Sequence, residues 1–282
     1  MRVHEQPLLL DGGRVGVLAL PASADQEVGV VLLNAGAIHR AGPSRLHVTL
    51  ARRLAAAGYP VLRIDQPGVG DAVASASRPQ LDLAMDMLDR FGREGGCSRF
   101  VVGGICSAAD FGWKLALRDP RVAGLLLLDP LARQQHPAFQ RGKWQLHWQR
   151  GPRSWIGTLA RRLRPAAGTQ SAVRPADSEL RDWPRPGEEA AQLQQLVDRG
   201  VELFVLYTGG AAAYFLHPLQ FLDGFGNAAR SARVSFRYWR DCDHVFFLPE
   251  HRERLQETFC EWMGQRFPAA SSRTRAAAPP HY

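Results

Sequence analysis

The chain of 282 residues is poor in cysteine and lysine and has no long apolar run. Its four cysteines lie far apart without a CxxC pair, which argues against a zinc site and against a disulfide-stapled secreted domain. No stretch of about 18 uncharged apolar residues is present, so we expect no membrane span. The charged N-terminus has no apolar core, so we expect no signal peptide and a cytoplasmic location. We also expect no cofactor and no metal.

Hydrophobic residues make up 45% of the chain and charged residues 22%, which is typical of a globular protein. Short apolar segments alternate with helical ones, which predicts an α/β domain with an eight-stranded, mostly parallel sheet flanked by helices. An antiparallel hairpin is expected to open it, and Ser44 to cap the first helix. The strands are expected at 3–10, 14–20, 29–33, 60–65, 99–105, 122–128, 202–207 and 234–239, and the helices at 44–58, 79–94, 108–118, 187–198, 218–225 and 250–267.

The alternation breaks at residues 131–186, where no strand signal occurs. We interpret this segment as a helical lid inserted into a core of residues 1–130 and 187–268, and residues 269–282 as a disordered tail. Between residues 131 and 176 there are nine basic side chains and no acidic one, so the net charge of +8 belongs to the lid. Its basic face is either simply solvated or docks an acidic carrier or an anionic membrane surface. No nucleic-acid-binding module is recognisable.

The most informative residues follow the fifth expected strand, which runs directly into a helix. A nucleophile in such a turn has a strained backbone and needs small residues two positions before and after it. Gly104 and Ala108 meet this condition for Cys106, whereas Ser107 in that role would have the bulky Ile105 at the tighter position. The register therefore favours Cys106 as the nucleophile. The alternative is an inert buried thiol.

A thiol nucleophile needs a base, and His244 is placed to supply one. Among the nine histidines, it is the one that follows the last expected strand and precedes the last expected helix. In that loop an imidazole could overhang Cys106 and take up its proton. An ordinary loop histidine is the alternative interpretation.

A third group should hold the imidazole in its productive tautomer. The loop after the seventh expected strand, residues 208–213, contains no carboxylate. Asp129, at the end of the sixth, is the best substitute, and Asp223 and Asp241 are weaker candidates. If Asp129 only terminates its strand, a Cys–His dyad would have to suffice, because an adjacent imidazolium favours the thiolate.

Acyl chemistry also needs donors for a developing oxyanion. We expect them to be the backbone N–H of Ser107 and an N–H of Gly36 or Ala37, in the small-residue turn after the third strand. Three basic residues of the same loop are expected to border the substrate entrance: His39, Arg40 and Arg45. The alternative for each is a solvated loop side chain.

With these residues in view, positions 15–268 resemble the α/β-hydrolase superfamily. The segment 65–71 (DQPGVGD) is similar to its D-x-x-G-x-G turn, and 104–108 (GICSA) to its nucleophile elbow. More narrowly, residues 34–71 followed by GICSAAD resemble hydrolases associated with the exosortase A system of exopolysaccharide-producing bacteria, and serine-aminopeptidase-like hydrolases. The chain departs in having Cys for the usual Ser, as dienelactone hydrolase-like relatives do, and in lacking the acid after the seventh strand.

The resemblance implies an esterase, thioesterase or acyltransferase that works through a covalent acyl-enzyme. A Cys nucleophile favours transfer from a thioester, because thiol–thioester exchange is nearly isoenergetic. The expected substrate is an acyl ester or thioester, carried for example on an acyl carrier protein or coenzyme A. The alternative function is a catalytically silent hydrolase-like protein that binds an acidic carrier or partner through its basic lid.

Overall fold

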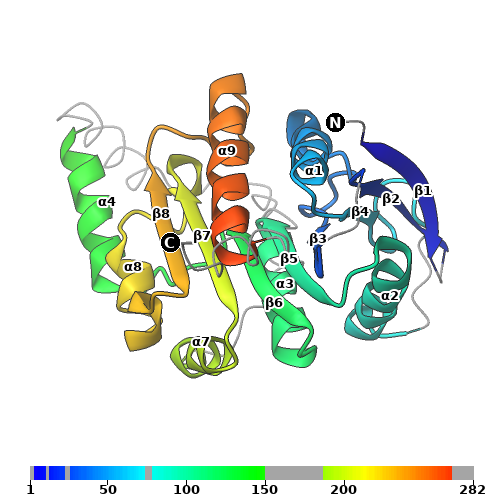
Figure 1. Ribbon diagram of the computed structural model, residues 1–282. Coiled ribbons are helices and arrows are strands. Elements are labelled where there is room, and N and C mark those ends of the chain that lie inside the picture. Colours follow the sequence, from blue (N-terminus) through cyan, green and yellow to red (C-terminus); the bar gives the residue numbers. More distant parts are fainter. Residues whose placement is uncertain (1–2, 11–12, 23–25, 74–77, 150–186, 269–282) are drawn as a thin grey trace, which may run out of the picture.

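The computed structural model describes residues 3–10, 13–22, 26–73, 78–149 and 187–268. Eight strands in these ranges form one sheet in the order β1-β2-β4-β3-β5-β6-β7-β8 (Figure 1). Only β1 with β2 and β2 with β4 pair antiparallel, and the other neighbours are parallel. The predicted sheet and its opening hairpin are confirmed. The strands are β1 (His4–Leu10), β2 (Arg14–Leu20), β3 (Val28–Leu32), β4 (Val61–Asp65), β5 (Arg99–Ile105), β6 (Val122–Leu128), β7 (Glu202–Thr208) and β8 (Val234–Trp239).

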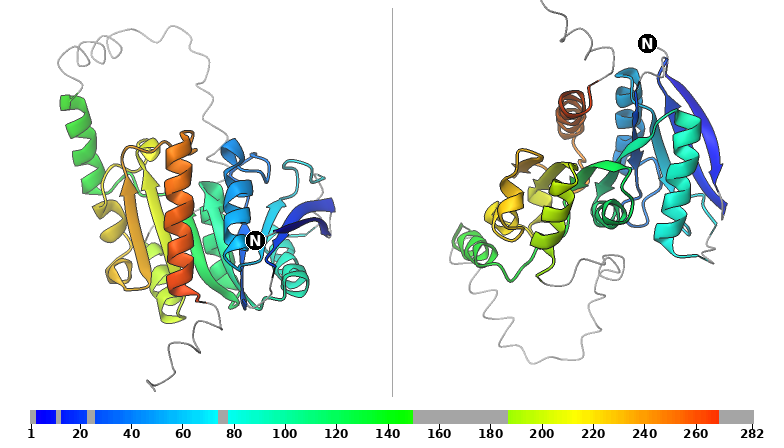
Figure 2. Two further views of the ribbon diagram at one scale, coloured as in Figure 1. Left: turned by 45° about the horizontal axis from the view of Figure 1, so that its top comes forward. Right: turned by 60° about the horizontal axis from the view of Figure 1, so that its bottom comes forward.

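Helices cover both faces of the sheet (Figure 2). Helices α1 (Leu46–Ala56) and α9 (Pro249–Arg266) pack together on one face, where their apolar side chains form a single buried cluster with the strands. Helices α2 (Gln80–Gly95), α3 (Ser107–Arg118) and α7 (Glu189–Asp198) cover the opposite face over a second cluster. The remaining elements are helix α4 (Pro137–Gln149), the short helix α8 (Leu219–Leu222) and the 3-10 turns Pro43–Arg45, Gly209–Ala211 and Asn227–Arg230.

The central strands are mostly apolar because helices bury both of their sides. Every residue of β3, β4, β6 and β7 is buried. The sequence of β6, VAGLLLL, shows this most plainly. Such a sheet gives a rigid platform, and its carboxyl edge is where the loops that follow β3 to β8 meet.

The predicted helix start at Ser44 is wrong. Ser44 lies in a 3-10 turn with φ of 46°, Arg45 has φ of 61°, and α1 begins at Leu46 without a side-chain cap. The carbonyl of Ala41 instead accepts the N–H of His47 at 3.0 Å. A main-chain oxygen therefore satisfies the helix start, and the serine hydroxyl is not needed there.

Helix α4 forms the first part of the predicted lid and lies between β6 and β7 in the chain. Its Trp144 side chain is exposed. The rest of the predicted lid, residues 150–186, and the predicted tail, residues 269–282, lie outside the described residues. Within the described part of the chain, no helix combines the length and apolar character that crossing a bilayer requires.

The close packing of β5 against β6 can be tested at Gly103. Its φ is 145°, and an added Cβ would overlap the backbone oxygen of Leu126. Gly103→Ala should therefore lower the free energy of unfolding, measured in urea, by at least about 2 kcal/mol. Gly264→Ala in α9 is the control, because nothing lies within 4 Å of its Cβ position, and it should be neutral or stabilising by about 0.5–1 kcal/mol. Unchanged stability in Gly103→Ala would contradict the observed packing.

Candidate active site

Cys106 occupies the sharp turn between β5 and α3. Its φ of 60° and ψ of −121° are a strained combination for a residue with a side chain, and Ser107 is already the first residue of the helix. The N–H of Cys106 donates to the Leu128 carbonyl at 2.8 Å, which holds the turn on the sheet. A Cβ at Gly104 would lie 2.9 Å from that of Ala108, so the turn needs a glycine there. Strand, turn and helix thus present the Cys106 thiol at the carboxyl edge.

Asp129 lies directly after β6, on the strand beside β5, and its side chain is completely buried. Its carboxylate accepts the N–H of Thr208 at 2.6 Å and the hydroxyl of Thr208 at 2.6 Å. His244 Nδ1 lies 2.7 Å from the same carboxylate. A carboxylate only accepts, so Nδ1 carries a proton and Nε2 is left available on the ring, whose pKa Cys106 raises from close by. The structure therefore brings Asp129, His244 and Cys106 into one chain of contacts.

Burial lowers the pKa of His244, but hydrogen bonds and negative charges from Asp129 and Cys106 outweigh it and raise the pKa from 6.5 to about 9. The imidazole is therefore protonated at neutral pH. The protonated imidazole thus lies between the buried Asp129 carboxylate and Cys106.

Thr208 is a residue that the sequence reasoning missed. The loop after β7 has no acid of its own, but Thr208, the last residue of β7, donates twice to the acid that follows the neighbouring strand β6. Two glycines follow, and a Cβ on Gly210 would overlap the backbone N–H of His244. The small residues of 208–213 therefore let the loop after β8 settle against β7 and bring its histidine to Asp129. A threonine at the end of a strand beside an acid-bearing strand was the available signal.

The loop that carries His244 is held by its own neighbours. The Asp243 carboxylate accepts the N–H groups of Val245 and Phe247, both at 2.9 Å, and Phe246 is completely buried with φ of 54°. Asp243 therefore shapes the loop rather than orienting the imidazole. The weaker acid candidates are paired elsewhere, Asp241 with Arg254 at 3.2 Å and Asp223 with Arg230 at 2.7 Å.

The loop after β3 reaches the elbow through Gly36, whose N–H donates to Ser107 Oγ at 2.8 Å. Gly36 has φ of 56° and lies half-buried, and an added Cβ would meet open space. Ala37 is the next residue and is exposed. Of the two expected partners of Ser107, Gly36 is thus the one in direct contact with it.

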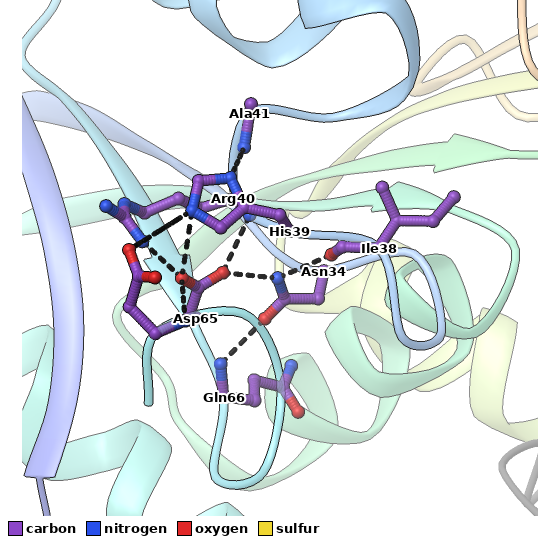
Figure 3. A network of polar contacts seen from close by, with 8 residues as sticks. Asn34, Ile38, His39, Arg40, Ala41, Asp65 and Gln66 are labelled. Carbon is purple, nitrogen blue, oxygen red and sulfur yellow. Dashed lines mark hydrogen bonds and ion pairs between the residues drawn. The ribbon is translucent and has the colours of Figure 1, made fainter. Parts of the chain in front are cut away.

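A buried carboxylate fixes this loop (Figure 3). Asp65, at the end of β4, accepts the Arg40 N–H at 2.7 Å, the Asn34 amide at 2.9 Å and the Asp71 N–H at 3.2 Å, and it also pairs with the Arg40 guanidinium. Asn34 in turn donates to the Ile38 carbonyl at 2.8 Å. The D-x-x-G-x-G segment therefore anchors both ends of the turn that carries Gly36.

The three expected entrance residues have different positions. Arg40 points inward to Asp65 and Asp71, and its side chain is 14% exposed, so it braces the loop. His39 is exposed, with Nε2 3.4 Å from Asp71 Oδ2, and Arg45 is exposed just before α1. His39, Asp65 and Asp71 lie close enough to share a cation, but the Arg40 guanidinium already occupies the space between these two carboxylates and pairs with both of them, and we assign no metal there.

Comparisons with known proteins point to one fold. An alpha-beta serine hydrolase homologue from Coxiella burnetii matches with a TM-score of 0.55 and 11% identity, over 93% of this chain and 98% of that one. A serine hydrolase without a lid from Xanthomonas campestris matches with a TM-score of 0.51 and 14% identity, over 96% and 97%. The chain has the α/β-hydrolase fold. A proline iminopeptidase from Mycobacterium smegmatis shares this α/β-hydrolase fold with a TM-score of 0.50 and 17% identity, over 93% and 98%.

No family model and no curated protein matches the sequence. At such low identities a shared α/β-hydrolase fold says where a site lies and leaves its chemistry to be argued from the residues. In this chain the carboxyl edge carries Cys106, Asp129 and His244.

Replacing Asp129 should change the titration of His244. Asp129→Asn removes the negative charge and the acceptor that stabilise the imidazolium, so the pKa of His244 should fall clearly below about 9, because Cys106 alone then opposes the lowering by burial. NMR titration of the ring with labelled histidine would measure it. Asp241→Asn is the control, since this carboxylate pairs with Arg254 and should leave the value near 9. An unchanged pKa in Asp129→Asn would contradict the assigned contact.

The hydrogen bonds and the ion pair of Asp65 should contribute measurably to the free energy of unfolding. Arg40→Ala leaves a buried carboxylate without its counter-charge and should cost about 3 kcal/mol in urea unfolding. Arg90→Ala removes an exposed pair with Glu94 on α2 and should cost less than about 0.5 kcal/mol. Equal effects of the two changes would show that the Arg40 contact is no stronger than a surface ion pair.

Proposed function

We propose that the protein is an acyl-transfer enzyme of the thioesterase, esterase or acyltransferase type, with Cys106 as nucleophile, His244 as acid and base, and Asp129 orienting the imidazole. The observation that carries this proposal is the chain of contacts from buried Asp129 through His244 to Cys106, which stands at the strained turn of an α/β-hydrolase fold. Strained backbone and a raised histidine pKa at one place are typical of catalytic sites.

The proposed reaction has two stages. The Cys106 thiolate attacks the acyl carbon, and a tetrahedral intermediate forms whose oxyanion is held near Ser107 and Gly36. His244 Nε2 then gives its proton to the departing thiolate or alkoxide, and a thioester to Cys106 remains. In the second stage water, an amine or a hydroxyl attacks this thioester, His244 takes the proton of the attacking group, and the Cys106 thiolate is released.

Several features favour a thioester substrate. The similar structures from Coxiella burnetii and Xanthomonas campestris are described as serine hydrolases, whereas this chain has Cys106 at the turn. The nine basic side chains between residues 131 and 176 support a substrate carried by an acidic protein or by coenzyme A. As part of the same proposal, the chain is a cytoplasmic bacterial relative of the exosortase-associated hydrolases.

Covalent labelling tests the nucleophile directly. Incubation with a p-nitrophenyl acyl ester or an acyl coenzyme A should leave one acyl group on the protein in intact-protein mass spectrometry, and Cys106→Ala should abolish it. Cys260→Ala is the control, because burial raises the pKa of that thiol to about 11 and its loss should leave the adduct unchanged.

An undiminished adduct in Cys106→Ala would refute the assignment. If no acyl donor labels the wild-type protein, and it instead binds an acidic carrier protein with an affinity that falls steeply with salt, the protein is a binding module with this fold.

A further inference from the structure

The expected oxyanion site already contains an oxygen atom of the protein. Ser107 Oγ lies 2.8 Å from the Gly36 nitrogen and accepts its hydrogen bond. Ser107 directly follows Cys106 and begins α3, which is the position whose N–H serves as an oxyanion donor in elbows of this fold. The Gly36 N–H is therefore not open to a substrate oxygen as the chain stands.

We propose that the Ser107 hydroxyl is a catalytic group, which receives the Gly36 hydrogen bond and donates its own proton to the developing oxyanion. This inference rests on the proposed acyl transfer at Cys106. The oxyanion would then be held by two donors of one residue, the N–H and the O–H of Ser107, and Gly36 would act through the hydroxyl.

The chemistry of a hydroxyl supports this arrangement. A serine oxygen has two lone pairs and one proton, so accepting from Gly36 leaves the proton free to be donated. A hydroxyl that accepts one hydrogen bond becomes a better donor in a second, because the two bonds polarise each other. The proton moves closer to the oxyanion as charge develops there and returns when the tetrahedral intermediate collapses, so no net transfer is required.

The surroundings keep this hydroxyl in place. The turn that carries Gly36 is anchored by Asn34 and Arg40 on the buried Asp65 carboxylate (Figure 3). Ser107 is fixed at the start of α3, where Gly104 and Ala108 pack closely. Both partners of the Gly36–Ser107 hydrogen bond are therefore held in position. Stabilisation of an oxyanion needs donors that are preorganised in this way.

The alternative is that the Ser107 hydroxyl is inhibitory: it occupies the Gly36 N–H as a plug and must rotate away before a substrate oxygen can bind there. The two roles predict opposite effects of removing the hydroxyl. If the hydroxyl is a donor, Ser107→Ala should transfer the acyl group more slowly than the wild-type protein. If it is a plug, the variant should be as fast as the wild type or faster.

Two reactions of Cys106 separate the hydroxyl's role from general damage. Acylation by a p-nitrophenyl ester builds an oxyanion, whereas alkylation by iodoacetamide displaces iodide at a methylene and builds none. Single-turnover acylation should be at least about tenfold slower in Ser107→Ala and close to wild type in Ser107→Thr, which keeps the hydroxyl. Alkylation should proceed at the wild-type rate in all variants. Ser231→Ala is the matched control, because Ser231 also accepts a backbone N–H, that of Arg233, and should change neither rate.

Each other outcome overturns the inference. Acylation of Ser107→Ala at or above the wild-type rate assigns the hydroxyl as a plug or a spectator. An equal fall in acylation and alkylation shows that the substitution disturbs Cys106 itself, and a Ser107→Thr as slow as Ser107→Ala shows that the hydroxyl is not the group that matters. No acylation of the wild-type protein refutes the proposed function and this inference with it, whereas normal acylation that is insensitive to Ser107 refutes the inference alone.

Discussion

A buried carboxylate at the end of β6 is the constraint around which the catalytic edge is arranged. Asp129 is completely removed from solvent, and an ionised group in such a place is tolerated only when hydrogen bonds satisfy its oxygens. Thr208 supplies two of them from the end of β7, and His244 a third from the loop after β8. The need to satisfy one charge thus draws three strand ends together and determines the tautomer and the charge of the imidazole.

A second buried carboxylate does the same for the other side of the site. Asp65 collects donors from Asn34, Arg40 and Asp71, and so holds the loop after β3 against the turn after β4. That loop brings the Gly36 N–H to Ser107. The elbow with Cys106 lies between two loops, each anchored on a charge that solvent cannot reach.

Much of this could be read from the sequence where the signal was local. Apolar runs and turn residues predict the strands and their direction, and the small residues around Cys106 indicate a strained turn. His244 follows from its place after the last strand. The contacts of Thr208 with Asp129 and of Gly36 with Ser107 join residues more than 70 positions apart, and no local pattern encodes them. The prediction that Ser44 caps α1 failed for a related reason. The carbonyl of Ala41 accepts the N–H of His47 in its place, and the sequence pattern does not reveal this contact.

Cys106 and Asp129, which follow β5 and β6, are held by the same part of the sheet, whereas His244 is not. Ile105 and Leu128 are partners in the parallel ladder, so the residues that follow them, Cys106 and Asp129, extend one rung of the sheet. Twisting of the sheet moves both together and preserves their spacing. His244 lies on a separate loop, the one after β8. A displacement of that loop would separate His244 from Asp129 and from Cys106 at once, while the distance between the Cys106 thiol and the Asp129 carboxylate stays the same.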